Sequence, residues 1–214
     1  MSRFKHIIEQ DPQQVQQQNL PSDWPKVFPK SIVGLDRDGV INIDKGYLTN
    51  PDDWEPIPGS LEAIRMIRLK GYKTVILTNQ GGITKKEQTR EQVDAIHQRM
   101  FEVFGNAGIY SIDGLFYSES SLKEDYYAKP NIGMFHRTEK EIFNSKIRFK
   151  DKGFYVGDKI TDLKAAERIG ATPILVRTGY GLETEKDLKK FSKEKLRKKT
   201  KVFDDLLQFA QRLP

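Results

Sequence analysis

The sequence contains no cysteine and only three histidines. It can therefore form neither a disulfide nor a thiolate metal site, and it has no thiol nucleophile, which fits a reducing compartment. The spacing of His6, His97 and His136 is not that of paired metal ligands, so we expect no zinc site. Apolar runs are no longer than a strand, and the Gln-rich residues 1–20 have no apolar core of a signal peptide. We expect a cytoplasmic protein with no membrane span.

The chain has little net charge outside one late segment. Residues 186–201 hold nine Lys or Arg against two acids, a net charge of +7, whereas the whole chain carries +6. The rest of the chain therefore sums to −1. A basic run of this kind is typical of a solvated helix face, and it also fits a patch that binds the phosphate backbone of nucleic acid.

The length of 214 residues fits one domain with an extension. Residues 1–29 are predicted to be a Gln-rich arm with a Pro-rich lead-in, and residues 30–214 the folded domain, including the basic segment 186–201 and a C-terminal helix. Short apolar runs predict five strands, which lie at 31–35, 73–78, 114–117, 153–157 and 173–176. Their alternation with helical patterns predicts an α/β fold, a doubly wound and mainly parallel sheet flanked by helices. The intervals leave no room for a large cap domain.

Helices are predicted from capping residues and apolar periodicity. Ser60 is expected to cap a helix that ends at Gly71, and Thr84 with Glu87 to form a capping box for a long amphipathic helix. Further helices are expected at 131–143, 163–170 and 206–213. Residues 42–58 are expected to form a long loop or a small hairpin.

Polar side chains follow three of the predicted strands. Asp36 and Asp38 come after the first strand and point the same way because side chains alternate; Thr78 and Asn79 end the second strand, and Asp158 follows the fourth. The carboxyl ends of parallel strands meet at one edge, where ligands bind. Close carboxylates are costly without a cation or a proton between them, and Mg²⁺ suits oxygen ligands beside a phosphate. The sequence therefore predicts a Mg²⁺ site at this edge.

Three residues near this edge have two interpretations each. Asp162, four residues after Asp158, can face the same cation or can favour its helix N-terminus through the macrodipole. Lys129, which Pro130 holds extended, is either an ordinary surface lysine or a clamp for a phosphate. The hydroxyl of Thr78 precedes a Gly-rich turn, so it either binds phosphoryl oxygens or simply ends its strand.

Four motifs, taken in order, resemble those of the haloacid dehalogenase superfamily of aspartate-nucleophile phosphatases. They are Leu35-Asp36-Arg37-Asp38-Gly39, Leu77-Thr78-Asn79-Gln80, Lys129-Pro130 and Val156-Gly157-Asp158-Lys159 with Asp162. Within that superfamily the chain is similar to the heptose-bisphosphate and histidinol-phosphate phosphatases. That likeness rests on Val40-Ile41-Asn42, Gly46-Tyr47, Gly82-Ile83, Gly133-Met134 and Val176-Arg177-Thr178-Gly179. The resemblance runs from about residue 30 to residue 181.

The resemblance implies a phosphoric monoester hydrolase of the haloacid dehalogenase type with a covalent two-step mechanism. Asp36 would attack phosphorus, while Asp38 would protonate the leaving alkoxide and then activate water. The Asp36 side chain, the Asp38 carbonyl and Asp158 would hold Mg²⁺. Gly46 and Tyr47 would contact the substrate.

The same resemblance implies supporting roles for four more residues. Thr78 and Lys129 would balance charge on the transferring phosphoryl group. Asn79 would orient Asp38 or the substrate, and Lys159 would support the acidic cluster.

The chain departs from the family pattern at two points. The stretch from Tyr117 to Tyr127 is short and lacks the zinc-binding cysteines that the sugar-phosphatase branch often carries. Ala128 stands where an arginine that grips a second phosphate often precedes the lysine, and Lys85 or Lys86 are candidates to supply the missing charge. Both departures concern the substrate and leave the hydrolytic residues intact.

We therefore expect a monomeric, Mg²⁺-dependent phosphomonoesterase of carbohydrate metabolism that acts on a small sugar phosphate, heptose-bisphosphate-like, or on a related metabolite. The alternative is a nucleic-acid 3′-end phosphatase, because the Thr-Asn-Gln and Lys-Pro-x-x-Gly-Met patterns also resemble polynucleotide 3′-phosphatases and the segment 186–201 is basic. A third possibility is a non-catalytic binding protein on an inherited fold.

Overall fold

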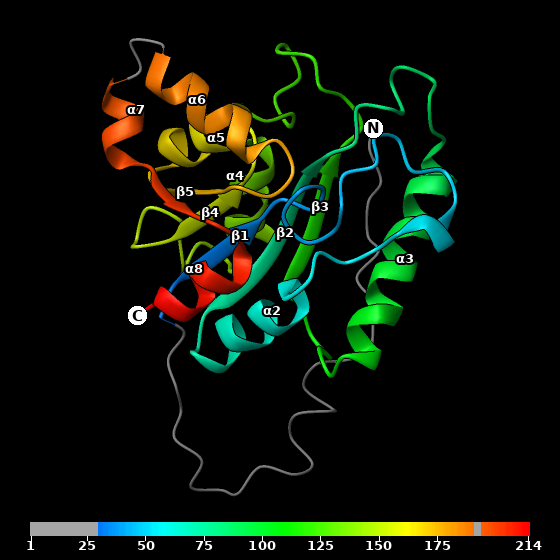
Figure 1. The fold of residues 1–214 in the computed structure, drawn as a ribbon, viewed down its shortest axis with the longest axis horizontal. Coiled ribbons are helices and arrows are strands. Elements are labelled where there is room, and N and C mark those ends of the chain that lie inside the picture. The colour runs from blue at the N-terminus through cyan, green and yellow to red at the C-terminus, as the bar shows by residue number, and fades with distance from the viewer. Residues whose placement is uncertain (1–29, 191–193) are drawn as a thin grey trace, which may run out of the picture.

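The computed structural model describes residues 30–190 and 194–214, and the predicted arm at 1–29 lies outside the described residues. Figure 1 shows one twisted sheet flanked by helices. The sheet has six parallel strands in the order β3-β2-β1-β4-β5-β6. The strands are β1 (Ile32–Leu35), β2 (Lys73–Asn79), β3 (Gly114–Ser118), β4 (Phe154–Gly157), β5 (Thr172–Val176) and β6 (Lys201–Phe203).

Helices connect the strands and cover both faces of the sheet. They are the 3₁₀ helix η1 (Pro51–Asp53), α2 (Ser60–Leu69), α3 (Arg90–Asn106), α4 (Gly133–Glu141), α5 (Ile160–Ile169), α6 (Gly181–Lys190), α7 (Glu194–Lys199) and α8 (Leu206–Arg212). The doubly wound α/β fold that the sequence predicts is thus confirmed, and the described residues contain no large cap domain.

Strand residues alternate between two apolar cores, one on each face of the sheet. Val33 and Leu35 of β1 pack into the core under α2, α3 and α8, whereas Ile32 packs into the core under α4 and α5. This alternation follows from the two-residue period of a strand. Because both faces are covered, the strands read as continuous apolar runs.

The order of the strands fixes where a ligand can bind. From β1 the chain runs outward through β2 to β3, then crosses back to β4 on the other side of β1 and continues outward to β6. The order therefore reverses between β1 and β4, and a crevice opens at the carboxyl ends of strands at such a switch point. The loop from 42 to 58 lies beside this edge as a small hairpin, in which Ile43 N–H donates to the Glu55 carbonyl at 2.9 Å and Asn42 bridges Pro56.

Two predicted helix caps are wrong. The helix after the Gly-rich turn begins at Arg90, and its capping box pairs Thr89 with Gln92 and not Thr84 with Glu87. The Thr84 hydroxyl instead donates to the Glu119 carbonyl at 2.5 Å, which ties the turn to the loop after β3. Ser60 lies inside α2 after the N-cap Gly59, and its hydroxyl donates to the Ile41 carbonyl at 2.7 Å.

No pattern in the sequence predicts β6 (Lys201–Phe203). This strand has only three residues and begins with an exposed lysine, so it has neither the length nor the apolar pattern of the other five. It lies between the basic segment and α8, and it pairs with β5 through Val202 opposite Leu175.

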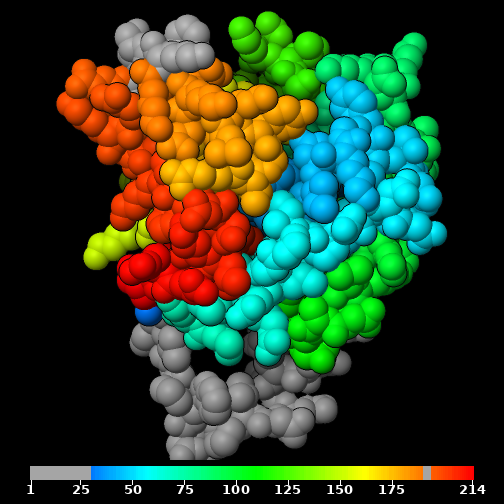
Figure 2. Space-filling model, viewed as in Figure 1, coloured from blue at the N-terminus to red at the C-terminus, as the bar shows by residue number. Residues whose placement is uncertain are grey.

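The described residues of the basic segment lie in the second half of α6, in α7 and at the start of β6, at the edge of the sheet away from β3. Several of its lysines pair with acids of this chain. These ion pairs are Lys189–Glu185 at 3.0 Å, Lys198–Glu194 at 2.7 Å and Lys199–Glu167 at 3.3 Å. Figure 2 shows α6 and α7 above α8, which packs beside α2 on this face. None of the described helices is long and apolar enough to cross a membrane.

Asp113, directly before β3, connects that strand with α2 and with the start of β2, and we expect it to stabilise the fold. Its carboxylate, only 11% exposed, accepts from Arg68 at 2.7 Å, from Lys73 at 2.8 Å and from Thr74 N–H at 2.8 Å. Burial opposes its ionisation, but these three donors outweigh burial and lower its pKa. Asp113→Asn should lower the free energy of unfolding by about 2 kcal/mol at pH 7, measured by urea denaturation.

The pH dependence of this difference follows from the lowered pKa. The stabilisation is complete above the ordinary carboxyl pKa of about 3.9 and disappears as the pH falls through the lower pKa of the folded state. Wild type and variant should therefore converge in stability below that pH. Asp151→Asn, at an exposed ion pair, is the matched control; an equal loss in both variants would contradict the assignment.

Candidate active site

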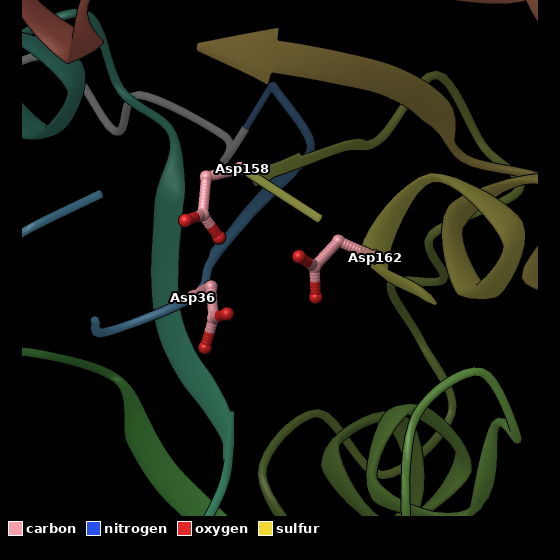
Figure 3. A group of neighbouring side chains, drawn as sticks. All are labelled: Asp36, Asp158 and Asp162. Atoms are coloured by element: carbon pink, nitrogen blue, oxygen red, sulfur yellow. The ribbon is translucent and has the colours of Figure 1, made fainter. Parts of the chain in front are cut away.

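Three carboxylates from separate elements converge at the reversal of strand order (Figure 3). Asp36 follows β1, Asp158 follows β4, and Asp162 lies in the first turn of α5. All three are buried, and each offers an oxygen within 4.8 Å of the others. The structure thus brings Asp36 and Asp158 together as the sequence predicts, with Asp162 beside them.

Lys129 supplies a positive charge to this acidic cluster. Its Nζ lies 2.9 Å from Asp36 Oδ1 and 2.7 Å from Asp162 Oδ1, and it donates to the Tyr155 hydroxyl at 2.9 Å. The side chain is 1% exposed. Burial disfavours the ammonium charge, but Asp162 and Asp36 outweigh burial and raise the pKa of Lys129. Lys129 is therefore a buried, charged group facing two carboxylates, not an ordinary surface lysine.

The backbone of Lys129 is fixed by Asn79 at the end of β2. Lys129 N–H donates to Asn79 Oδ1 at 2.9 Å, and Asn79 Nδ2 donates to the Lys129 carbonyl at 3.0 Å. This two-way contact differs from the expectation that Asn79 orients Asp38 or the substrate. Asn79 lines the cavity, but the hydrogen bonds shown by its side chain hold the lysine.

Asp158 is a buried carboxylate with only one of its two oxygens in a hydrogen bond to the residues that the structure describes. Its Oδ2 accepts from Tyr180 N–H at 2.8 Å, whereas its buried Oδ1 has no hydrogen-bond partner among the described residues. Burial and the neighbouring Asp162 raise the pKa of Asp158 to about 8. In the pH range of most enzymes, this group holds a proton unless a cation replaces it.

Two glycines allow the backbone to close around Asp158. Gly39 and Gly179 have positive φ angles of 79° and 56°, and a Cβ on either would collide with Asp158 Oδ2. The loops after β1 and β5 can therefore approach this carboxylate only because both positions lack a side chain.

Asp38 points to the same edge but belongs to a different set of contacts. Its carboxylate accepts from Arg37 Nη2 at 2.9 Å, from Gln80 Nε2 at 3.0 Å and from Asn42 Nδ2 at 3.0 Å. Burial raises its pKa, but Arg37 and these amide donors outweigh burial, so the pKa is lowered. Asp38 is thus a fixed carboxylate with its side chain 14% exposed.

Gln80 and His97 belong to the site although the sequence analysis gave neither a role. Gln80 Nε2 also donates to Thr78 Oγ1 at 2.9 Å, so one amide connects Asp38 with Thr78. His97, considered only as a metal ligand, lies 3.0 Å from Arg37 Nη1 through its Nε2. The position of Gln80 directly after the Thr-Asn pair was the available signal; His97 had none, because its partner is 60 residues away.

A cavity of 290 Å³ opens over these groups. The groups lining it are Asp36, Asp38, Tyr47, Thr78, Asn79, Gly81, Ser121, Lys129, Lys159, Thr161 and Asp162. Tyr47 is 46% exposed, and its hydroxyl accepts from Lys85 Nζ at 2.8 Å. Of the two lysines suggested as replacements for the missing arginine, Lys85 is therefore the one shown in contact with a residue of the cavity wall.

Lys159 and the loop after β1 close another side of the cavity. Lys159 Nζ donates to Asp44 Oδ2 at 2.9 Å and lies 4.7 Å from the centre of the Tyr180 ring. Burial opposes its charge, but Asp158, Asp36 and Asp44 raise its pKa. Gly46 N–H donates to Asp44 Oδ1 at 2.9 Å, so Gly46 shapes the loop that presents Tyr47.

Hydrogen bonds organise the cysteine-free loop after β3. Asn131 Nδ2 donates to the carbonyls of Lys123 and Asp125, each at 2.8 Å, and Leu122 N–H donates to Ser120 Oγ at 3.0 Å. These contacts fold the loop that carries Ser121 to the cavity without any thiolate ligand.

The sequence of this chain is similar to those of known phosphatases. The sequence model described as "Polynucleotide kinase 3 phosphatase" matches residues 31–208. The D-glycero-beta-D-manno-heptose-1,7-bisphosphate 7-phosphatase of Neisseria meningitidis serogroup A is 33% identical over 182 residues, which cover 84% of this chain and 92% of that protein. The Pseudomonas aeruginosa protein of the same name is 32% identical over 188 residues, covering 86% and 98%.

Solved structures give the same result. The D,D-heptose 1,7-bisphosphate phosphatase from B. bronchiseptica, in complex with magnesium and phosphate, matches with a TM-score of 0.74 at 30% identity, covering 86% of this chain and 97% of that chain. The D,D-heptose 1,7-bisphosphate phosphatase from Burkholderia Thailandensis matches with a TM-score of 0.62 at 32% identity, covering 86% and 97%. The chain is accordingly a phosphoric monoester hydrolase, and it belongs to the polynucleotide kinase 3 phosphatase family within the haloacid dehalogenase superfamily.

Proposed function

We propose that this protein is a Mg²⁺-dependent phosphomonoesterase that hydrolyses a small sugar phosphate, or a related metabolite, through an aspartyl-phosphate on Asp36. One observation carries the proposal: Lys129 Nζ lies between Asp36 and Asp162, while Asp158 shares the same buried space. A nucleophilic carboxylate, a cation site and a fixed ammonium are the groups that phosphoryl transfer requires.

The acidic residues fit a hard divalent cation. Asp158 Oδ1 is buried without a hydrogen-bond partner in the described part of the chain, and burial and Asp162 raise the pKa of this carboxyl further than Lys159 lowers it. Asp162 already has partners on both oxygens, Lys129 Nζ on Oδ1 and Lys159 N–H on Oδ2 at 3.0 Å. The side chains of Asp36 and Asp158, with the Asp38 carbonyl, would therefore hold Mg²⁺. When bound, the ion supplies charge neutralisation for the phosphoryl oxygens.

Asp36 and Asp38 divide the chemistry between them. The Asp36 carboxylate attacks phosphorus and forms an acyl phosphate, the bond from phosphorus to the leaving oxygen breaks, and Asp38 gives a proton to the departing alkoxide. Asp38 then removes a proton from the water that attacks the acyl phosphate, which releases phosphate and restores Asp36.

Asp38 is ionised in the free protein, as the second step, the attack of water on the acyl phosphate, requires. Its lowered pKa makes it a carboxylate in the free protein, which is the form that accepts a proton from water. For the first step Asp38 needs a proton, and the substrate supplies it: a phosphate monoester has its second pKa near about 6, so it arrives partly as the monoanion, passes that proton to the Asp38 carboxylate, and Asp38 then gives it to the departing alkoxide.

The remaining residues bind and orient the phosphoryl group. Lys129 balances its negative charge, and the Thr78 hydroxyl, which accepts from Gln80, has its proton free to donate to a phosphoryl oxygen. Asn79 acts by holding the Lys129 backbone.

The shape of the site favours a small substrate. The cavity of 290 Å³ has room for a phosphorylated sugar, and Tyr47 and Lys85 stand where its far end would lie. The heptose-bisphosphate phosphatases to which the chain is similar act on such a substrate by name. With Ala128 buried beside Lys129, Lys85 is the cation we propose to contact a second polar group of the sugar.

A nucleic-acid 3′-end phosphatase is the second candidate, since the matching family model is described as "Polynucleotide kinase 3 phosphatase". The basic segment gives this candidate limited support, because three of its lysines form ion pairs within the chain.

A substrate comparison separates the two candidates. We expect the value of kcat/KM for sugar phosphates, or for histidinol phosphate, to exceed that for a 3′-phosphorylated oligonucleotide by at least about tenfold, because the cavity provides no long basic track. A preference for the oligonucleotide that weakens steeply between about 50 and 200 mM salt would contradict the sugar-phosphate assignment.

Asp36→Asn should reduce kcat by at least about 10³-fold, because the amide cannot act as the nucleophile. Rapid acid quench of the wild type during turnover, followed by borohydride reduction, should convert residue 36 to homoserine, detected by peptide mass spectrometry. Asp187→Asn, on the exposed face of α6, is the matched control and should keep wild-type activity. Full activity of Asp36→Asn would reject the nucleophile.

Mg²⁺ should stabilise the folded protein, and more strongly at pH 8 than at pH 5. Because the pKa of Asp158 is raised to about 8, the metal-free fold loses stability as the pH rises from about 4 to 8, and Mg²⁺ competes with fewer protons at the upper end. At about 100 times its Kd, Mg²⁺ adds about 2.7 kcal/mol, or roughly 5–10 °C in Tm. Differential scanning fluorimetry should show this shift in the wild type and not in Asp158→Asn; an equal shift in both would contradict the site.

EDTA should abolish turnover, and Zn²⁺ should not restore it.

A further inference from the structure

The guanidinium of Arg37 is a fully buried charge next to the reacting groups. Arg37 is 0% exposed, and its side chain donates to Asp38 through Nε at 3.2 Å and through Nη2 at 2.9 Å. Nη2 also donates to Gln80 Oε1 at 3.0 Å. A buried guanidinium is tolerated when its donors all have acceptors in a fixed geometry, so its contacts determine where Asp38 lies.

His97 on α3 accepts from the remaining arm of this guanidinium. Nη1 and His97 Nε2 are 3.0 Å apart, and an arginine has only donors, so Nε2 must be the acceptor and the ring proton lies on Nδ1. His97 is 5% exposed. Burial and Arg37 lower its pKa well below the usual value, which agrees with a neutral ring.

The imidazole is itself held in place by β3 and α3. Its ring packs against Tyr117 with centroids 5.1 Å apart, and the Tyr117 hydroxyl donates to Asp94 Oδ1 at 2.8 Å, one turn before His97 on the same helix. The helix is anchored at its start by the capping box of Thr89 and Gln92. A continuous set of contacts therefore leads from α3 through His97 and Arg37 to Asp38.

We propose that His97 is a positioning residue: it holds the Arg37 guanidinium in the orientation that keeps the Asp38 carboxylate in line with the leaving oxygen. The inference rests on the proposed function, in which Asp38 donates a proton to that oxygen. His97 does not reach the cavity lining, so it acts only through Arg37.

This role makes a specific prediction about leaving groups. An alkoxide is a poor leaving group and needs its proton from Asp38, whereas 4-nitrophenolate departs without one. Misplacement of Asp38 should therefore lower kcat/KM for an alkyl phosphate far more than for 4-nitrophenyl phosphate, because kcat/KM reports phosphoryl transfer to Asp36 and not the later hydrolysis, in which Asp38 acts alike on both substrates. A general loss of fold or of phosphate binding would slow both substrates equally.

Two substitutions form a matched pair. In His97→Gln the amide oxygen reaches the position of Nε2 and can accept from Arg37, whereas in His97→Asn it stops near the position of Nδ1 and cannot. We expect His97→Asn to lower kcat/KM for a sugar phosphate about 10- to 100-fold, with less than about threefold loss in kcat/KM for 4-nitrophenyl phosphate. His97→Gln should recover most of the loss on the sugar phosphate.

Arg37→Lys tests the same contact from the other side, because an ammonium cannot donate to Asp38, Gln80 and His97 in one plane. It should show the same selective loss, and it carries the test if His97→Asn does not fold. Equal losses in kcat/KM for the two substrates, or wild-type kinetics for His97→Asn, would overturn the proposal. These results are distinct from failure of the proposed function, which is detected by activity of Asp36→Asn on both substrates.

Discussion

The site depends on the balance of charge around Lys129. Two carboxylates, Asp36 and Asp162, lie within 2.9 Å of its ammonium, and a third, Asp158, shares the same buried space. One lysine cannot compensate three buried carboxylates, and the excess appears as the raised pKa of Asp158. The low-dielectric interior that makes this cluster costly also strengthens its attraction for a cation.

The fold creates this balance by bringing the carboxyl ends of separate strands together at one edge of the sheet. The strand order reverses between β1 and β4, so Asp36 and Asp158 are adjacent although more than a hundred residues separate them. Glycines at 39 and 179 let two loops approach Asp158 closely, and Asn79 ties Lys129 to the end of β2. Each group is therefore positioned by backbone that belongs to the sheet edge, which suits a site where charge must be preorganised.

Much of this arrangement could be predicted from the sequence, because strand periodicity and parallel order determine which residues meet at the carboxyl edge. Asp36, Asp38, Thr78 and Asp158 fall there for that reason. What the sequence could not indicate were contacts made across long separations by flexible side chains. Gln80 reaches Asp38, Asn79 reaches the Lys129 backbone, and His97 reaches Arg37.

The sequence also could not decide between two similar capping motifs for the start of α3. Both Thr84-x-x-Glu87 and Thr89-x-x-Gln92 can form a capping box. The structure uses the second because the first threonine is tied to the loop after β3 by its hydroxyl. The three-residue β6 is defined by its neighbour β5 and has no pattern of its own.

The proposed Mg²⁺ would complete the charge balance at Asp158. Titration calorimetry of the purified protein with Mg²⁺, in two buffers of different ionisation enthalpy, measures both the stoichiometry and the protons released. Because the pKa of Asp158 is about 8, the account predicts one Mg²⁺ per chain with release of close to one proton at pH 7, falling toward none at pH 9. Mg²⁺ binding without proton release at pH 7, or undiminished binding to Asp158→Asn, would contradict it.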